Sequence, residues 1–202
     1  MKINTGKSSM RQASVTRIVL LCIQGFSTLL VSISVADQHP DQVARPPNIL
    51  FCISDDQSYA NTGANGDPVV QTPAFDRIAR EGLRFTHAFC DAPTCGPSRS
   101  AILTGQHIWR LEEAGNIHST LPAKFATYTE ELGRVGYAVG FTGKGWSPGR
   151  LQAGGRATNP AGLEFNKCQL NSIRKSISSR DYAANFDDFL SEIKPGQPFC
   201  FW

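Results

Sequence analysis

The sequence lacks the patterns of several protein classes. Its six cysteines include no Cys-x-x-Cys pair and no cluster with the four histidines, so a structural zinc site is not expected. It has no internal repeat and no low-complexity tract, and its 41% hydrophobic and 18% charged residues are ordinary for a globular protein. A chain of 202 residues with this composition can bury one hydrophobic core, so we predict a folded domain.

An excess of positive charge is also missing once residues 1–36 are considered separately. That segment holds 4 of the 20 Lys and Arg residues and none of the 17 Asp and Glu residues, so 16 basic residues face 17 acidic ones in the remainder. A nearly neutral chain has no general attraction for phosphate backbones. We therefore predict no nucleic-acid partner.

Residues 1–36 have the pattern of a signal peptide. Four basic residues precede an apolar run, Ile18–Val35, and small residues lie where cleavage is expected. The alternative is a retained membrane helix, but polar residues and a glycine interrupt the run. We predict cleavage after Ala36, export to a periplasmic, extracellular or lysosomal-type compartment, and no stable membrane association afterwards.

The cysteines that remain after cleavage are odd in number. They are Cys52, Cys90, Cys95, Cys168 and Cys200. In an oxidising compartment an odd count implies one unpaired thiol or one modified cysteine. The pairing of the others cannot be deduced from their spacing.

The rest of the chain alternates strand and helix signals. After a polar linker at 37–47, we expect a strand at 48–54, buried on both faces because it is continuously apolar. We then expect a helix from Pro73 to Gly82, a strand or extended segment at 83–89, a capped helix after Thr127, a strand at 137–141, a helix from about Asp181 and a strand from Pro198. This order predicts an α/β fold with a mostly parallel sheet flanked by helices.

Two adjacent carboxylates, Asp55 and Asp56, directly follow the first predicted strand. Open α/β sheets bind their ligands at the carboxyl ends of strands, and adjacent carboxylates repel each other unless a cation neutralises them. Calcium suits such hard oxygen ligands. A solvated turn is the alternative for an isolated Asp-Asp pair.

The run Cys95-Gly96-Pro97-Ser98-Arg99 predicts a short helix that begins at Cys95 and ends before Gly105. The unpaired N–H groups and positive dipole at such a helix start form a site for a tetrahedral anion. One turn later, Arg99 can direct its guanidinium to the same anion. A cysteine phosphatase is the nearest alternative, but its H-C-x5-R spacing is absent, because Arg99 lies only four residues after Cys95.

This run, with Leu103-Thr104-Gly105 downstream, resembles the C-x-P-S-R signature of the sulfatase family. Further matches follow in the family's order at Pro47–Leu50, Thr72-Pro73, Phe75-Asp76, Leu83–Phe85 and Thr142-Gly143-Lys144. The resemblance spans roughly residues 45–202 and implies an alkaline-phosphatase-like fold, with 48–202 as the N-terminal portion of a catalytic domain. Because a predicted strand begins in the last few residues, we expect a truncated chain.

The resemblance also implies a mechanism. A separate maturation enzyme oxidises the cysteine to formylglycine, whose hydrate attacks sulfur; a plain thiol would leave an adduct with no second hydroxyl to expel sulfate. By resemblance, Asp55, Asp56 and the modified Cys95 bind calcium, Arg99 stabilises the aldehyde hydrate, and Lys144 contacts the sulfate oxygens. The expected activity is hydrolysis of a sulfuric ester or sulfamate.

The sequence departs from the family after Lys144. Many members carry a histidine two or three residues later, where Trp146 and Ser147 stand here. That histidine assists proton transfer in the family, so the base in this protein is not identified. The candidates are His87, His107 and His118, although a lone histidine is more often structural.

The substrate is predicted from weaker similarities. Ile117–Pro122 and Pro198–Trp202 look most like the heparan N-sulfatase branch, which acts on N-sulfoglucosamine. Basic residues outnumber Glu164 between 150 and 180 and would suit a polyanionic sugar, or form a solvated loop; they are Arg150, Arg156, Lys167, Arg174, Lys175 and Arg180. The alternatives are an inactive fragment, a phosphatase or phosphonate hydrolase of the same superfamily, and a binding module for sulfated polysaccharide.

Overall fold

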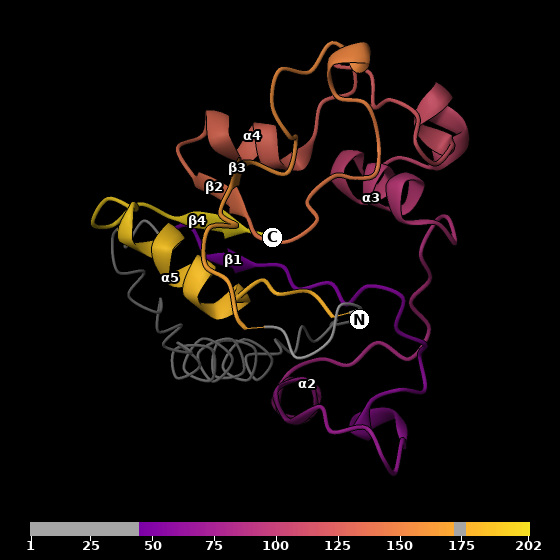
Figure 1. The fold of residues 1–202 in the computed structure, drawn as a ribbon, viewed down its shortest axis with the longest axis vertical. Coiled ribbons are helices and arrows are strands. Elements are labelled where there is room, and N and C mark those ends of the chain that lie inside the picture. Colours follow the sequence, from indigo (N-terminus) through magenta and orange to yellow (C-terminus); the bar gives the residue numbers. More distant parts are fainter. Residues whose placement is uncertain (1–44, 172–176) are drawn as a thin grey trace, which may run out of the picture. The chain divides into compact units, whose positions relative to one another are not determined.

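A computed structural model describes residues 45–171 and 177–202 (Figure 1). The predicted signal peptide and most of the predicted linker lie outside these residues. Within the described ranges, no helix combines the length and the hydropathy needed to cross a membrane.

The described residues contain one sheet of four parallel strands. These are β1 (Ile49–Leu50), β2 (Ala138–Phe141), β3 (Leu163–Glu164) and β4 (Phe199–Phe201), in the spatial order β1-β4-β2-β3. In this register Val139 of β2 lies opposite Cys200 of β4. The strands predicted at 137–141 and from Pro198 are therefore confirmed, as is the α/β class with a parallel sheet.

The prediction of a strand buried on both faces at 48–54 is wrong. The strand β1 has only two residues and lies at the edge of the sheet, where it pairs with β4 alone. A further hydrogen bond, from the Phe51 N–H to the Phe201 carbonyl (2.8 Å), extends the pairing by one residue. Because no described strand lies on the other side, Leu50 remains 54% exposed. The segment 83–89 forms no strand either, and Leu83 is 86% exposed.

The helices agree closely with the sequence. They are α2 (Pro73–Glu81), α3 (Cys95–Thr104), α4 (Tyr128–Arg134) and α5 (Tyr182–Ser191), with 3₁₀ turns at Gly63–Asn65, Ile108–Arg110, Glu112–Gly115 and Gln152–Gly154. The predicted capping box of α4 is present: the Thr127 hydroxyl accepts the Glu130 N–H, and the Glu130 carboxylate accepts the Thr127 N–H (2.9 Å). The Asp181 side chain caps α5 in the same way by accepting the Ala184 N–H (3.0 Å).

Helix α2 forms where expected, but Thr72 does not cap it and its apolar side chains are not buried. The hydroxyl of Thr72 makes no cap hydrogen bond; it accepts the Gly63 N–H and donates to Asp76 (both 2.9 Å). The apolar side chains of Phe75 and Ile78 are 46% and 68% exposed, so no described residue covers them fully. Polar contacts through Asp76 therefore hold α2 to the neighbouring 3₁₀ turn.

The core lies on both faces of the sheet. Helices α3 and α4 lie on one side and α5 on the other (Figure 1). On the first side Leu103 of α3 packs in one cluster with Phe141 of β2, and on the second Phe189 of α5 packs against Phe201 of β4 with ring centroids 4.5 Å apart. Gly140 allows this approach, because an added Cβ would lie 2.9 Å from the Phe189 ring. The sheet therefore lies between helices on both faces. The segments that follow the carboxyl ends of its strands are free to form the site.

Candidate active site

Cys95 is the first residue of α3, as predicted. Thr94 precedes it in an extended conformation and makes no side-chain cap hydrogen bond, so its hydroxyl does not occupy the backbone N–H groups at the helix start. The helix ends at Gly105, whose positive φ of 63° suits a glycine, and the Gly105 N–H closes the last turn on the Ala101 carbonyl (2.8 Å). The Cys95 side chain is partly exposed and thus accessible at a helix N-terminus that favours anions.

Arg99 projects from the same helix and is almost fully buried. It is 6% exposed, its Nη1 donates to the Gly145 carbonyl (2.8 Å), and its guanidinium lies 5.6 Å from the centre of the Trp202 ring. Its Nη2 faces the Asp55 carboxylate at 3.6 Å. One arginine therefore connects α3, the loop after β2 and the residues after β1.

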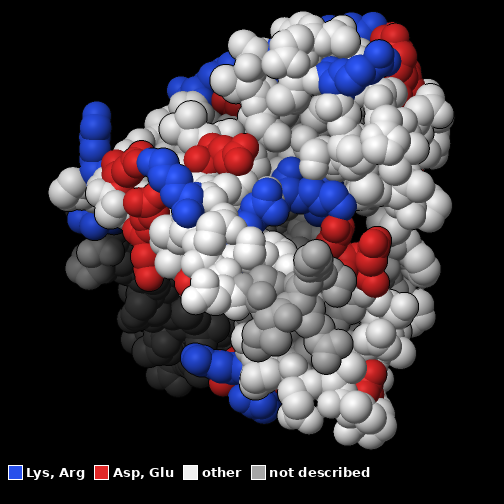
Figure 2. Space-filling model, viewed as in Figure 1, with Lys and Arg blue, Asp and Glu red and all other residues white. Residues whose placement is uncertain are grey.

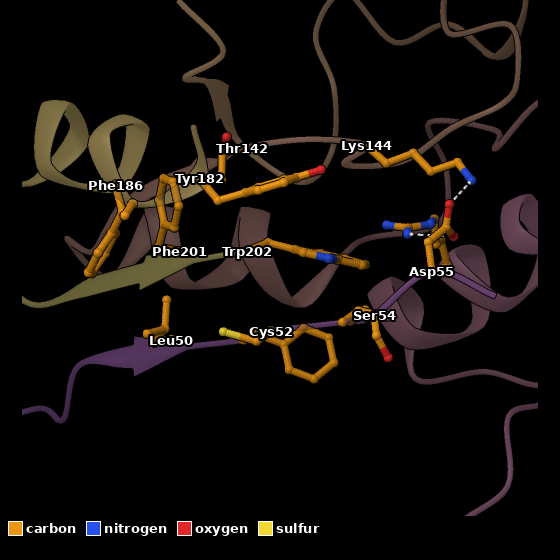
Figure 3. Close-up of a pocket in the computed structure, with 14 residues that line it drawn as sticks. Leu50, Cys52, Ser54, Asp55, Thr142, Lys144, Tyr182, Phe186, Phe201 and Trp202 are labelled. Carbon is orange, nitrogen blue, oxygen red and sulfur yellow. Dashed lines mark hydrogen bonds and ion pairs between the residues drawn. The ribbon is translucent and has the colours of Figure 1, made fainter. Parts of the chain in front are cut away.

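Asp55 and Lys144 form the second contact between these segments. The Lys144 Nζ donates to Asp55 Oδ2 at 2.6 Å, drawn as a dashed line in Figure 3. This hydrogen bond lowers the pKa of Asp55, with a further contribution from Arg99, and it raises the pKa of Lys144. The negative charge of a Cys95 thiolate adds to the rise for Lys144. Lys144 is therefore a cation at neutral pH. Asp55 contacts both Lys144 and Arg99, and Arg99 lies one turn after Cys95 in α3.

The Lys144 loop is held on both sides by asparagine side chains that the sequence analysis missed. Asn166 accepts the Gly143 N–H (2.7 Å) and donates to the Gly143 carbonyl (3.2 Å), while Asn159 accepts the Trp146 N–H (3.0 Å) and donates to the Trp146 carbonyl (3.1 Å). Gly143 has a positive φ of 81°, a conformation that glycine adopts without strain. No local pattern predicts these contacts, because the asparagines lie 13 and 23 residues away along the chain.

Trp146 does not take the place of the missing histidine. Its side chain is 3% exposed, and the indole N–H donates to the Ser100 hydroxyl (2.8 Å), which donates to the Gly96 carbonyl (3.0 Å). The indole is thus part of the packing between α3 and the Lys144 loop. The hydroxyl of Ser147 donates to the Lys144 carbonyl (3.0 Å). Both residues support the loop, and neither supplies a base with the pKa of an imidazole.

The three candidate histidines lie away from the Asp55–Lys144 pair. His107 contacts Asp91 through Nδ1 (2.5 Å) and stacks on Trp109, and His87 contacts the Thr86 hydroxyl (2.9 Å). Neither they nor His118 line the two pockets that contain Asp55 and Lys144. The described part of the chain therefore places no histidine beside the Asp55–Lys144 pair.

Asp55 and Asp56 fit calcium by the type of their ligand atoms. Both carboxylates follow β1 at the edge of the sheet, and Asp56 has a positive φ of 54°. Calcium takes six to eight oxygen ligands, so two aspartates and one modified residue fill only part of its shell. Within residues 45–171 and 177–202, no three His, Cys, Asp or Glu side chains are grouped closely enough to hold a metal ion. In this structure the cations Lys144 and Arg99 balance the charge of Asp55.

The basic residues between 150 and 180 do not act as one group. Arg156 is 5% exposed and donates to the Leu121 carbonyl (2.9 Å), the Phe125 carbonyl (2.5 Å) and the Glu130 carboxylate (2.5 Å). It is therefore a structural residue, and neither of the two alternatives, a contact with a polyanionic sugar or a place in a solvated loop, applies to it. Arg150 and Lys167 are exposed, whereas Arg174 and Lys175 lie outside the described residues.

Two pockets share the Asp55–Lys144 pair. The first, of about 540 Å³, is lined by this pair, Arg99 and mainly apolar residues, among them Trp202 and Tyr182 (Figure 3). The second, of about 530 Å³, has a more polar lining. On the face shown in Figure 2, basic side chains gather near the middle with acidic ones beside them. Cys95 and Asp56 line neither pocket. The first pocket can hold a tetrahedral anion against Lys144 and Arg99.

None of the five described cysteines forms a disulfide. Cys52 and Cys90 are exposed, Cys95 and Cys168 are partly buried and Cys200 is buried. Burial raises the pKa of the Cys200 thiol, which keeps it protonated inside the core. Of these thiols, Cys95 alone is the first residue of a helix and lies within electrostatic reach of Lys144.

Several known proteins resemble part of this chain. It is 34% identical over 122 residues to an N-acetylgalactosamine-6-O-sulfatase of Bacteroides thetaiotaomicron (58% of this chain, 24% of that protein). It is 38% identical over 107 residues to human arylsulfatase A (50% and 21%) and 35% identical over 139 residues to mouse steryl-sulfatase (63% and 22%). The chain thus spans less than a quarter of the length of these relatives.

A solved structure supports the fold. The crystal structure of Ps i-CgsB in complex with k-i-k-neocarrahexaose superimposes with a TM-score of 0.59 and 21% identity, covering 77% of this chain and 44% of that one. At this identity the likeness concerns the fold alone, and it agrees with the predicted α/β architecture. The family model for sulfatases matches residues 47–202, which is most of the chain. This chain therefore belongs to the sulfatase family.

Proposed function

We propose that this chain supplies the nucleophile and part of the anion-binding shell of a sulfuric ester or sulfamate hydrolase. The observation that carries the proposal is the contact of Asp55 with Lys144 and with Arg99, which lies one turn after Cys95 in α3. A tetrahedral sulfate placed there would face backbone N–H groups and two cations. Membership of the sulfatase family supports the same chemistry.

The nucleophile is proposed to be formylglycine made from Cys95 by a maturation enzyme. When formed, its hydrate supplies one hydroxyl that attacks sulfur and a second hydroxyl that allows sulfate to be expelled. The partial exposure of Cys95 makes it accessible both to that enzyme and to a substrate. Arg99, fixed by the Gly145 carbonyl, is positioned to stabilise negative charge next to this residue.

Lys144 is proposed to bind the sulfate oxygens. Because its pKa is raised by Asp55, it stays protonated throughout the neutral range and cannot act as a base there. Its role is therefore electrostatic: it stabilises charge that accumulates on the sulfate oxygens as the ester bond breaks. The contacts of Asn159 and Asn166 hold the Lys144 backbone in place, so little reorganisation is needed during the reaction.

Calcium is proposed as the cofactor, held by Asp55, Asp56 and the modified Cys95. When bound, it supplies positive charge that polarises the sulfate group. In this arrangement Asp55 would exchange part of its contact with Lys144 for the metal, which frees the Lys144 ammonium for a sulfate oxygen. The remaining ligands of a six- to eight-coordinate ion would come from outside the described residues.

The substrate is proposed to be a sulfated carbohydrate outside the cytoplasm, with N-sulfoglucosamine as the predicted example and aryl sulfates as simple analogues. The names of the relatives refer to sulfatases of N-acetylgalactosamine and of sterols, and the sequence identities to them are similar. The comparisons therefore support sulfate ester hydrolysis but do not favour one substrate. Degradation of glycosaminoglycans is the process that this substrate class suggests. Release of inorganic sulfate by the purified full-length gene product tests the proposal directly.

Replacing Lys144 by methionine should lower kcat for sulfate release by about 10²- to 10³-fold, the usual loss when one transition-state donor is removed. The change removes the ammonium and keeps the length of the side chain. The measurement is steady-state hydrolysis of 4-nitrophenyl sulfate by the full-length gene product, with calcium present.

Lys194→Met is the matched control, because Lys194 is exposed and lies outside both pockets. It should retain the wild-type kcat. An equal kcat for Lys144→Met and Lys194→Met would contradict the role of Lys144 in catalysis.

A further inference from the structure

The second pocket lies directly beside the proposed reaction site. Asp55, Lys144 and Tyr182 line both pockets, so the two cavities adjoin each other. Its polar lining includes Ser147, Glu164, Asn166, Ser178 and Arg180. Its volume of about 530 Å³ is in the range of pockets that bind small molecules. We call it the Arg180 pocket.

Arg180 is the charged residue of this pocket whose interactions are incomplete. Its Nε is buried and is the one buried side-chain nitrogen or oxygen in the described residues with no hydrogen-bond partner. No described carboxylate forms an ion pair with its guanidinium. A buried donor without a partner is costly, and a charged one more so. The two terminal nitrogens of Arg180 are not buried, so they are the donors that a ligand in the pocket can reach.

Each of the other charged groups of the pocket already has an ion-pair or hydrogen-bond partner. Asp55 accepts from Lys144, and its second oxygen faces Arg99. Glu164 accepts the Asn166 amide N–H (2.8 Å). Arg180 is therefore the cation that remains available to an incoming anion, next to the lysine proposed to hold the reacting sulfate.

The backbone holds Arg180 in a fixed position. Arg180 forms an isolated antiparallel bridge with Gln169, flanked by a hydrogen bond from the Asp181 N–H to the Cys168 carbonyl (3.1 Å). Asp181, the next residue, caps α5. Packing of α5 against the sheet thus fixes the base of this side chain, as a specific binding residue requires.

We propose that Arg180 binds a second anionic group, a carboxylate or another sulfate, on the carbohydrate whose reacting sulfate lies at Cys95 and Lys144. This inference rests on the proposed function and names a feature of its substrate. The planar guanidinium matches both oxyanions with paired N–H donors. The enzyme would thereby select polyanionic sugars over sugars with a single sulfate.

The test compares substrates with and without the second anion. The full-length gene product and its Arg180→Gln variant are assayed with 4-nitrophenyl sulfate and with three N-sulfated disaccharides. One disaccharide carries a uronate carboxylate, one carries a methyl-esterified uronate and a second sulfate, and one carries the methyl ester alone. For the substrates with a second anion we expect Arg180→Gln to raise KM about 10- to 100-fold at similar kcat, as for loss of a charged hydrogen bond.

The first two disaccharides show whether Arg180 binds a carboxylate or a sulfate. The KM of the Arg180→Gln variant should rise most for the disaccharide whose second anion Arg180 binds better. For 4-nitrophenyl sulfate and the methyl ester the change in KM should stay below about threefold, since neither has a group for Arg180 to bind. Arg180→Lys should recover part of the affinity by keeping the charge. Lys167→Gln, an exposed residue outside the pocket, should behave as wild type.

Titration calorimetry with the desulfated uronate disaccharide gives a readout that does not depend on turnover. Arg180→Gln should weaken its Kd about 10- to 100-fold. Equal KM changes on all substrates, an unchanged KM for the anionic disaccharides, or a Kd that does not depend on Arg180 would each overturn the inference. A wild-type protein that releases no sulfate but binds this ligand through Arg180 would contradict the proposed function alone.

Discussion

Replacement of Cys95 by alanine is expected to reduce kcat for sulfate release by roughly 10⁴- to 10⁶-fold, the loss seen when an enzyme's nucleophile is deleted. The substitution removes the atom from which the aldehyde is made, and no other described cysteine begins a helix beside Lys144. Alanine is a good helix former and Cys95 is partly exposed, so the fold should be retained. The measurement is the rate of 4-nitrophenyl sulfate hydrolysis, with a circular dichroism spectrum as the check on folding.

Cys90→Ala provides the matched control. Cys90 is exposed and lies five residues before Cys95, outside both pockets and outside α3. It should leave kcat unchanged. A Cys95→Ala protein that keeps more than about a tenth of the wild-type kcat would show that the reaction uses another nucleophile.

Replacement of Arg156 by methionine is expected to lower the free energy of unfolding by about 3–5 kcal/mol, as for other buried ion pairs that lose one partner. Methionine fills a similar volume but leaves the Leu121 and Phe125 carbonyls without the donors that Arg156 supplies. It also removes the partner of Glu130, whose carboxylate completes the capping box of α4. The measurement is the midpoint of urea unfolding of the full-length gene product, followed by tryptophan fluorescence.

Arg150→Met is the control for general effects of charge removal. Arg150 is exposed and belongs to the same segment, so its replacement should change the free energy of unfolding by less than about 0.5 kcal/mol. Equal unfolding midpoints for the two variants would contradict the structural role of Arg156 and return it to the candidates for sugar binding.

The helices could be predicted because their signals are local. Thr127 and Glu130 form the capping box from positions three residues apart, and Pro73 and Gly105 mark helix ends through their own backbone preferences. The edge position of β1 could not be predicted in the same way. A strand that begins at Ile49 pairs with one that begins at Phe199, and hydropathy alone does not indicate whether a second neighbour lies on its other side.

The candidate site was predicted in part. The resemblance to a family pointed to Asp55, Cys95, Arg99 and Lys144. The fold brings Asp55 into contact with Arg99 and Lys144, and it places Cys95 at the start of the helix that carries Arg99. Residues that position them were missed, because Trp146 reaches Ser100 across 46 residues, and Asn166 reaches Gly143 across 23. Such contacts follow from topology and have no periodic signal.

Arg156 and Arg180 also show that a role set by distant contacts cannot be predicted from the sequence. Both belong to one basic segment in the sequence, yet one is satisfied by three carbonyls and a carboxylate, while the other has a buried nitrogen without a partner. Their charge alone could not separate a structural arginine from a binding one. The hydrogen-bond partners of each guanidinium make that distinction.

The central claim is that Cys95 becomes the catalytic aldehyde, and peptide mass spectrometry of the full-length gene product tests it most directly. The protein is produced with its maturation enzyme, treated with a thiol-alkylating reagent and digested. We predict that residue 95 has the lower mass of an aldehyde in place of the thiol and carries no alkyl group, whereas the Cys90 side chain is alkylated. An alkylated Cys95 in a preparation that still releases sulfate would contradict the account.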